Sequence, residues 1–237
     1  MGQGRIISLK WDTEHFGIPC GRVQLTERED AASIQALYDE SSAYRFISLS
    51  NPNCNASNSR LLAEYTNAFV ADTNIQLCKA GLTPSVSMLE VENQTPYREE
   101  AIELARTAFR HSRFLADSRL AACGGNTVYA EWVKNAFARD EKYFALAKEE
   151  NRTTGFVLFH FEEKAAVIEL IAVTHSGQGM GTGKTLWNAV EATAVKKGLN
   201  VVRVGTQVTN QQALNFYIKM GCRIESVSQI YHMWRQD

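Results

Sequence analysis

The sequence predicts an α/β fold built around a central mixed sheet. Short apolar runs alternate with longer segments whose apolar residues recur every three or four positions, the pattern of strands alternating with amphipathic helices. Gly and Pro residues separate several of these segments. With 237 residues, 45% of them hydrophobic and 22% charged, the chain has the composition of a globular protein. It is long enough for one large domain or two small ones.

The first third of the chain alternates strand-like and helix-like segments. The tract at 51–60 is polar and predicts a loop, and a turn at 80–84 carries both Gly and Pro. We take that turn as a domain boundary, with a smaller α/β domain at 1–83 and a second domain at 84–237. The expected elements of the first domain are strands at 7–11, 21–25 and 45–50 and helices at 29–44 and 61–69.

The remainder of the chain predicts a mixed sheet flanked by helices. A strand at 85–91 leads to a helix that starts near Thr95-Pro96, because Pro is favoured in the first helical turn. The other expected elements are helices at 127–137, 186–198 and 210–221 and strands at 142–148, 155–161, 167–173, 201–206 and 223–234.

Charge and cysteine content exclude several classes of protein. A net charge of −1 gives no basis for a nucleic-acid partner. Five cysteines without a CxxC pair argue against a disulfide framework, and no spacing predicts a metal site. No stretch reaches the ~18 apolar residues of a membrane span and no signal-peptide pattern is seen, so we expect a cytoplasmic protein with no membrane partner.

A glycine-rich loop follows the apolar run VIELIAV and reads SGQGMGTGKT, residues 176–185. A strand, a glycine loop and a helix in succession favour anion binding, since loop and helix N–H groups point at a phosphate. A nucleotide P-loop is excluded because Gln178 stands where its first Gly is required, and the dinucleotide pattern fails at Thr182. The loop therefore indicates another phosphorylated ligand, with the glycines at 177, 179 and 181 as its informative residues.

Three segments together resemble the GCN5-related N-acetyltransferases (GNAT). Residues 176–181 are similar to that family's pyrophosphate loop, with Ser176 in the place of the usual Gln or Arg. Asn210, Tyr217 and Gly221 match its late N-x-x-A-x-x-x-Y-x-x-x-G signature, and strand 167–173 corresponds to the strand that holds acetyl-pantetheine. The resemblance implies a GNAT fold and acetyl-CoA as the cofactor. The binding residues that it implies are Ile171, Ala172, Val173, Gly177, Gln178, Gly179, Met180, Gly181, Thr182, Gly183 and Asn210.

Further segments at 8–25, 108–114, 129–137 and 204–221 resemble the bacterial nucleotide-sugar enzymes of the same family. That resemblance implies an acceptor that is a dTDP-linked 4-amino-4,6-dideoxyhexose, used in surface-polysaccharide synthesis. It also implies that the N-terminal domain is a truncated copy of the GNAT fold and that the protein forms a homodimer.

Two residues are candidates for proton transfer. The resemblance assigns Tyr217 the protonation of the departing thiolate, whereas its helical position alone favours an aromatic core residue. Glu169 lies mid-strand with Val167 and Ile171 expected on its face, where a carboxylate is costly unless it is paired or lines a wet cleft. It is a candidate general base, with a solvated position or an ion pair with Arg203 as the structural alternatives. His175 or a water molecule could serve instead.

The loop formed by His111, Ser112, Arg113 and Phe114 follows a predicted helix and is a candidate for binding the acceptor. Arg113 suits a diphosphate and Phe114 could stack on a base or sugar. A helix-ending surface loop is the structural alternative. For the whole protein, the alternatives are a GNAT enzyme acting on another small-molecule amine or a peptide amine, and a non-catalytic acyl-CoA-binding module.

Overall fold

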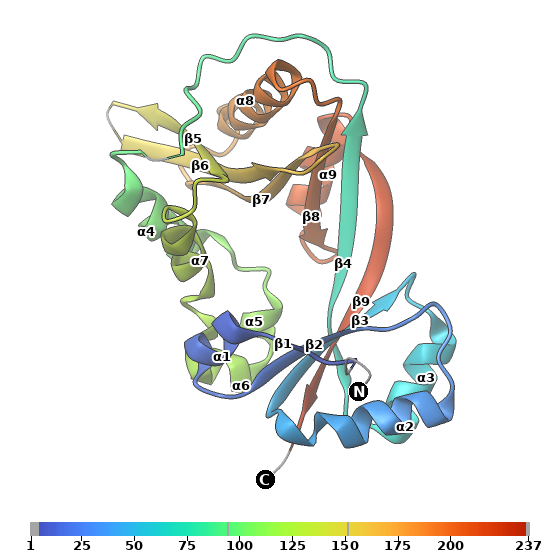
Figure 1. Ribbon diagram of the computed structural model, residues 1–237. Coiled ribbons are helices and arrows are strands. Elements are labelled where there is room, and N and C mark those ends of the chain that lie inside the picture. The colour runs from blue at the N-terminus through green and yellow to red at the C-terminus, as the bar shows by residue number, and fades with distance from the viewer. Residues whose placement is uncertain (1–4, 94, 151, 236–237) are drawn as a thin grey trace.

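The computed structural model describes residues 5–93, 95–150 and 152–235, which form one continuous nine-stranded sheet with helices on its faces (Figure 1). The order of the strands is β1-β2-β3-β9-β4-β8-β7-β6-β5. Their bounds are β1 Ile7–Ser8, β2 Cys20–Gln24, β3 Phe46–Pro52, β4 Phe69–Ala80, β5 Lys142–Glu149, β6 Arg152–Phe161, β7 Ala166–Val173, β8 Val201–Gln207 and β9 Arg223–Trp234. The predicted α/β class with a mixed sheet is confirmed.

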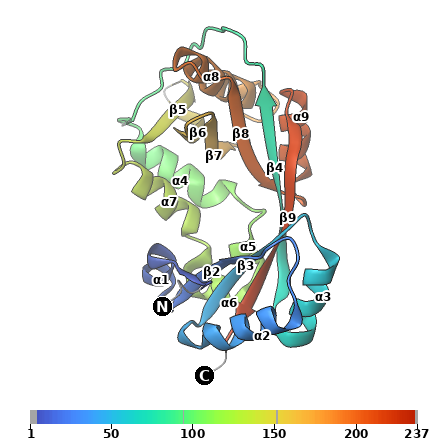
Figure 2. The same ribbon diagram turned by 45° about the vertical axis from the view of Figure 1, so that its right-hand side comes forward.

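The helices are short and cover the sheet in separate groups. In the C-terminal half, α4 and α7 pack on one face and α8 on the other, with an apolar core on each side (Figures 1 and 2). Their bounds are α1 Lys10–Phe16, α2 Ala31–Glu40, α3 Ala56–Tyr65, α4 Arg98–Ala108, α5 Arg113–Ala116, α6 Ser118–Leu120, α7 Val128–Ala136, α8 Thr182–Lys196 and α9 Gln211–Lys219, with short turns η1 Ser41–Ala43 and η2 Ala121–Gly125.

The strand β4 joins the two halves of the sheet. It lies between β9 and β8 and pairs antiparallel with both along most of its length. Figure 2 shows β4 and β9 running side by side from the region of α2 and α3 to the region of α9. Strands from the segments 1–83 and 84–237 therefore pair with one another in a single sheet. The division of the chain at residue 83 stays a prediction.

Three expectations for individual elements are wrong. Only Ile7–Ser8 of the segment 7–11 is a strand, and Lys10–Phe16 forms helix α1, which ends at Gly17 with a φ of 68°. The second concerns the loop predicted at 51–60 and the helix predicted at 61–69: β3 runs to Pro52 and α3 spans Ala56–Tyr65. Phe69 then opens β4, a strand that was not predicted.

The predicted strand at 85–91 is the third. These residues have no strand structure, and Glu92 makes only an isolated bridge to Phe144. Val86 is 93% exposed and Met88 91% exposed, so the apolar residues that suggested a strand do not reach the core. Residues 81–93 instead arch over the end of the sheet (Figure 1).

None of the helices among the described residues is long and apolar enough to cross a membrane.

Candidate functional site

The glycine loop after β7 forms a cradle of backbone N–H groups. Gly179 and Gly181 have φ values of 79° and 86°, a conformation that L side chains rarely adopt, and open space lies where a Cβ would be. Gly181 is the residue before α8. No hydrogen bond within the described residues uses the backbone N–H groups of Gly179, Gly181, Thr182, Gly183 or Lys184. A helix N-terminus with free donors attracts an anion.

Beside this cradle, the parallel strands β7 and β8 separate. They pair only at Ala166–Val202, Val167–Arg203 and Ile168–Val204. After Ile168, β7 stays paired with β6 as far as Val173, while β8 stays paired with β4 as far as Gln207. The facing edges of the two strands therefore diverge, with backbone groups that have no ladder partner across the gap among the described residues. An extended ligand can pair with such an edge.

A β-bulge sets the direction of Glu169. In the β6–β7 ladder, Leu158 pairs with Leu170 and Phe159 pairs with Ile168, so Glu169 is the extra residue. The bulge shifts the alternation of side chains along β7 by one residue. Ile168 therefore packs on the α8 side, whereas Leu170, two residues later, packs on the α4 and α7 side. The expectation that Glu169 shares a face with Ile171 is wrong for this reason, since Ile171 packs on the α8 side.

Glu169 is held by three donors from neighbouring elements. Trp132 of α7 donates its indole N–H to Oε2 at 2.8 Å, and His160 Nδ1 lies 2.6 Å from Oε1. Lys142 Nζ forms an ion pair with the same Oε1. Burial by itself would raise the pKa of Glu169, but the hydrogen bonds from His160, Lys142 and Trp132 outweigh it and lower the pKa to about 2.

The alternative ion pair expected for Glu169 does not form. Arg203 instead pairs with Glu225, at 3.1 Å, and lies 3.7 Å from Glu162. His175, the other candidate base, is exposed on the glycine loop.

Tyr217 lies on α9 and is only 4% exposed. Its ring contacts Trp187 and Phe216, with centroids 6.0 Å and 5.4 Å away. Burial raises the pKa of Tyr217 well above its ordinary value, with a smaller contribution from Cys222. The phenol is therefore protonated at neutral pH, as a proton donor must be.

Asn210 caps α9, and Gln212 on the same helix contacts Gln178 of the glycine loop. Asn210 is the N-cap of α9 and its side chain accepts a hydrogen bond from the backbone N–H of Ala213 at 3.1 Å. Gln212 Nε2 donates to Gln178 Oε1 at 3.4 Å. The side chain of Asn210 thus already has a structural role, and its predicted contact with pantetheine stays a prediction.

The candidate acceptor loop folds as a turn followed by α5. Ser112 is 7% exposed and caps α5, and Phe114 is 5% exposed in a core with Phe16 and Trp234. Phe114 therefore offers no free face for a base or sugar, contrary to expectation. Arg113 lies over the Phe114 ring, 4.4 Å from its centroid, while His111 is exposed.

Arg113 also lines a pocket of about 290 Å³ between α5, the start of β4 and the end of β8. Its polar lining consists of Asp72, Thr73, Ser112, Arg113, Gln207 and Thr209. The pocket adjoins the point where β8 has left β7, so it lies beside the mouth of the separated strands.

All five cysteines are free thiols. Burial raises the pKa of Cys20 and of Cys222 to about 12, which leaves both thiols protonated and weakly nucleophilic. The described residues contain no group of His, Cys, Asp and Glu side chains suited to a metal ion.

Residues 99–222 match the acetyltransferase (GNAT) family. The matched segment covers more than half of the 237-residue chain and includes the glycine loop, both separated strands and α9. The protein therefore belongs to the acetyltransferase (GNAT) family and is an acyltransferase.

Two curated proteins give the comparison more detail. The chain is 26% identical over 231 residues to dTDP-fucosamine acetyltransferase from Escherichia coli O6:H1, a match that covers 96% of each protein. It is 28% identical over 165 residues to the spore coat polysaccharide biosynthesis protein SpsD of Bacillus subtilis, covering 67% of this chain but only 57% of SpsD.

Solved structures confirm the fold. A functionally unknown conserved protein from Staphylococcus epidermidis superposes with a TM-score of 0.68 at 11% identity, over 100% of this chain and 93% of the other. A tandem GNAT protein from the clavulanic acid pathway gives 0.58 at 13% identity, over 93% and 77%. Identities this low bear on the fold alone.

Members of the family use acetyl-CoA as the acyl donor. The observed loop fits such a group, because its N–H groups are free and a Cβ at Gly179 or Gly181 would require a strained backbone. Lys184 supplies an exposed positive charge in the first turn of α8.

Most residues around Glu169 and the pocket were not predicted from the sequence. No role was expected for Asp72, Trp132, Lys142 or His160. Lys142 and His160 face each other in the β5–β6 register, so a correct strand alignment could have found them. No sequence pattern marks Asp72, because β4 itself was not predicted.

Proposed function

We propose that this protein transfers an acetyl group from acetyl-CoA to the amine of a nucleotide-linked amino sugar. The proposed acceptor is a dTDP-linked 4-amino-4,6-dideoxyhexose. The observation that carries the proposal is the free N–H cradle at Gly179–Lys184 beside the separated edges of β7 and β8. The cradle suits the pyrophosphate of the donor, and the separated edges suit its extended arm.

The acceptor class is supported by the relatives. The match to dTDP-fucosamine acetyltransferase extends over 96% of both chains, so it includes the N-terminal segment as well as the GNAT segment. The second relative is named for polysaccharide biosynthesis. That name supports the proposal of a role in the synthesis of a surface polysaccharide.

In the proposed reaction the amine nitrogen attacks the thioester carbonyl carbon, the C–N bond forms and the C–S bond breaks. The nitrogen loses one proton and the sulfur gains one, giving an amide and a free thiol. Unpaired backbone N–H groups of β7 beyond Ile168 would stabilise the negative charge that develops on the carbonyl oxygen. Binding both substrates in one cleft supplies much of the rate.

We assign the donation of the proton to Tyr217. Its burial keeps the phenol protonated, and it lies on α9, the helix that follows the end of β8 where the strands have separated. A phenol positioned next to the sulfur can protonate it as the C–S bond breaks.

Glu169 then has an electrostatic role in addition to holding its neighbours. A carboxylate with a pKa of about 2 is too weak a base to remove a proton from an ammonium group directly. Its permanent negative charge would instead stabilise the positive charge that forms on the attacking nitrogen, and the proton would leave to water. The pH profile decides between the two roles: a direct base would set the acidic limb of kcat/KM, and Glu169→Gln would move that limb.

The function is tested by incubating the protein with acetyl-CoA and a panel of dTDP-amino sugars, free amino sugars and peptides, followed by mass spectrometry. We expect a mass increase of one acetyl group on a nucleotide-linked amino sugar. Acetylation of peptides alone would contradict the proposed acceptor. Tight binding of CoA without turnover on any amine would instead indicate a binding module.

A further inference from the structure

Buried polar atoms without partners gather around α5. Within the described residues, Asp72 Oδ2, Arg113 Nε and His232 Nε2 are buried and have no hydrogen-bond partner. An unsatisfied buried polar group destabilises the folded state, so several in one region indicate a missing binding partner. Asp72 and Arg113 both line the pocket of about 290 Å³.

The two pocket residues offer opposite hydrogen-bonding chemistry. Asp72 Oδ2 can only accept when it is ionised, and Arg113 Nε can only donate. A hydroxyl group meets both needs at once, because it donates one hydrogen bond and accepts others. A ring that carries neighbouring hydroxyl groups meets both needs with two of them.

The electrostatics of the pocket oppose the diphosphate that the sequence suggests for Arg113. The guanidinium already interacts with two carboxylates, since it counteracts the burial that raises the pKa of Asp72 and that of Asp12. A diphosphate would enter next to Asp72 and compete with these charges for Arg113. A neutral polyhydroxylated group brings no such repulsion.

The pocket is connected to Glu169 through α7. Tyr129 interacts electrostatically with Arg113 and Asp72 and forms a hydrogen bond with Ser112. Its ring is parallel to that of Trp132, with centroids 6.4 Å apart and 3° between the planes. Trp132 donates in turn to Glu169. A ligand in the pocket thus lies along a line of packed side chains that leads to the proposed site of acetyl transfer.

We propose that Asp72 and Arg113 bind ring hydroxyl groups of the acceptor sugar and thereby orient its amine. The inference rests on the proposed function. It makes the site composite, because Asp72 belongs to the segment 1–83 whereas Arg113, Gln207 and Thr209 belong to 84–237. The N-terminal segment then supplies a specificity residue as well as strands for the sheet.

The test pairs a residue change with a hydroxyl removal. Initial rates are measured for the wild type, Asp72→Ala and Arg113→Gln on dTDP-4-amino-4,6-dideoxygalactose and on its 2-deoxy and 3-deoxy analogues. We expect the wild type to prefer the parent over one analogue by at least about tenfold in kcat/KM. In Asp72→Ala that preference falls to about one, and the acceptor KM rises at least about tenfold in both variants. The Kd of acetyl-CoA stays unchanged in each.

Matched controls are Asp39→Ala on α2 and Arg106→Gln on α4, both at exposed positions away from the pocket. Asp72→Ala that keeps the full preference for the parent over its analogues would overturn the inference and leave the proposed function intact. A wild type that binds acetyl-CoA but acetylates no nucleotide-linked sugar would overturn both. A purely structural role predicts lower thermal stability with unchanged acceptor KM, which also counts against the inference.

Discussion

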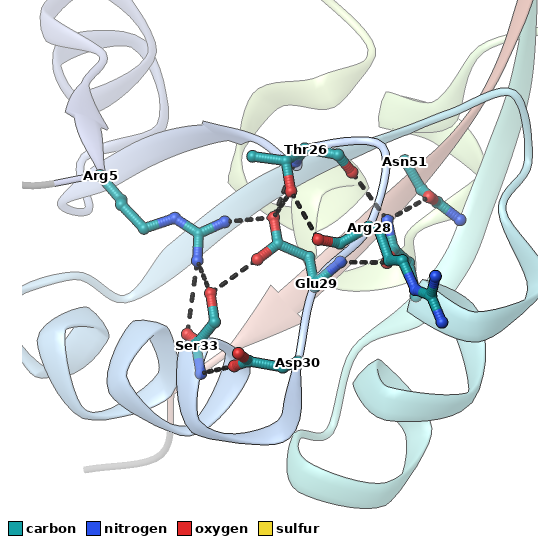
Figure 3. Close-up of polar contacts among 8 residues, drawn as sticks. Arg5, Thr26, Arg28, Glu29, Asp30, Ser33 and Asn51 are labelled. Carbon is teal, nitrogen blue, oxygen red and sulfur yellow. Dashed lines mark hydrogen bonds and ion pairs between the residues drawn. The ribbon is translucent and has the colours of Figure 1, made fainter.

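Two carboxylates in this protein have opposite surroundings. Glu29, before α2, accepts hydrogen bonds from Arg5 at 2.6 Å, from the Thr26 backbone at 2.7 Å and from Ser33 at 2.6 Å (Figure 3). Its own backbone N–H donates to Asn58 at 2.9 Å. Asp72, on β4, has a buried oxygen with no partner among the described residues.

The comparison separates a structural cluster from a binding site. Around Glu29, burial would raise its pKa, but the hydrogen bonds from Ser33, Thr26 and Arg5 prevail and lower it. Around Asp72, burial prevails and the pKa is raised. A cluster whose members satisfy one another fixes the entry to a helix, whereas one with unmet groups can pair them with a ligand.

The largest expected effect is the loss of stability when the hydrogen bonds around Glu29 are removed. Glu29→Ala removes the acceptor for Arg5, Thr26 and Ser33, and we expect it to lower the free energy of unfolding by about 3 kcal/mol. Urea denaturation measures the loss. The folded fraction should retain the wild-type KM for both substrates, and a changed KM would show that the cluster also shapes the active site.

Glu169 should contribute stability that depends on pH. Its folded pKa of about 2 lies below the ordinary 4.5, so the contribution is present above pH 4.5 and disappears as the pH falls toward 2. The difference corresponds to on the order of 3 kcal/mol. Urea denaturation between pH 6 and 2 should show that Glu169→Gln loses this part of the pH dependence. Glu163→Gln, at the exposed turn between β6 and β7, is the control and should behave as the wild type.

Removing the proposed proton donor should affect catalysis without affecting the fold. We expect Tyr217→Phe to lower kcat about 100-fold with little change in KM or melting temperature, because the ring and its packing are retained. Tyr231→Phe is the matched control, since Tyr231 is 4% exposed in the core beside α2 and α3 and donates to Gln229 at 3.2 Å. Equal turnover by the two variants would remove Tyr217 from the mechanism.

The smallest effect concerns the cradle. Gly181→Ala places a Cβ in a left-handed backbone at the N-terminus of α8, and we expect the acetyl-CoA KM to rise about tenfold. Gly198, with a φ of 75° and open space around it, lies beyond the other end of the same helix. Gly198→Ala should cost similar stability, about 1 kcal/mol, without changing the KM. Steady-state kinetics and thermal melts of both variants show whether the change in KM is specific to Gly181.

Sequence patterns predicted the elements whose apolar residues recur regularly along the chain. The strands at 45–50, 142–148 and 167–173 and the helix at 186–198 are present because apolar periodicity reports the buried face directly. The glycine loop was recognised for the same reason, since its function depends on consecutive residues.

Features that depend on long-range pairing were not predictable. The strand β4 alternates poorly, with only Ile75 and Leu77 buried, and it is extended because it pairs with β8 and β9. The bulge at Glu169 depends on the register with β6, and the partners of Glu169 come from three other elements. Asp72 and Arg113 are 41 positions apart and meet only through the fold.

The most direct test of the distinction between the two carboxylate sites is a crossed measurement on Glu29→Gln and Asp72→Asn. For each variant, the melting temperature and the KM for dTDP-4-amino-4,6-dideoxygalactose are determined side by side. The account predicts that Glu29→Gln melts at a lower temperature with an unchanged KM, and that Asp72→Asn keeps the melting temperature with a raised KM. A lower melting temperature with an unchanged KM in both variants would contradict it.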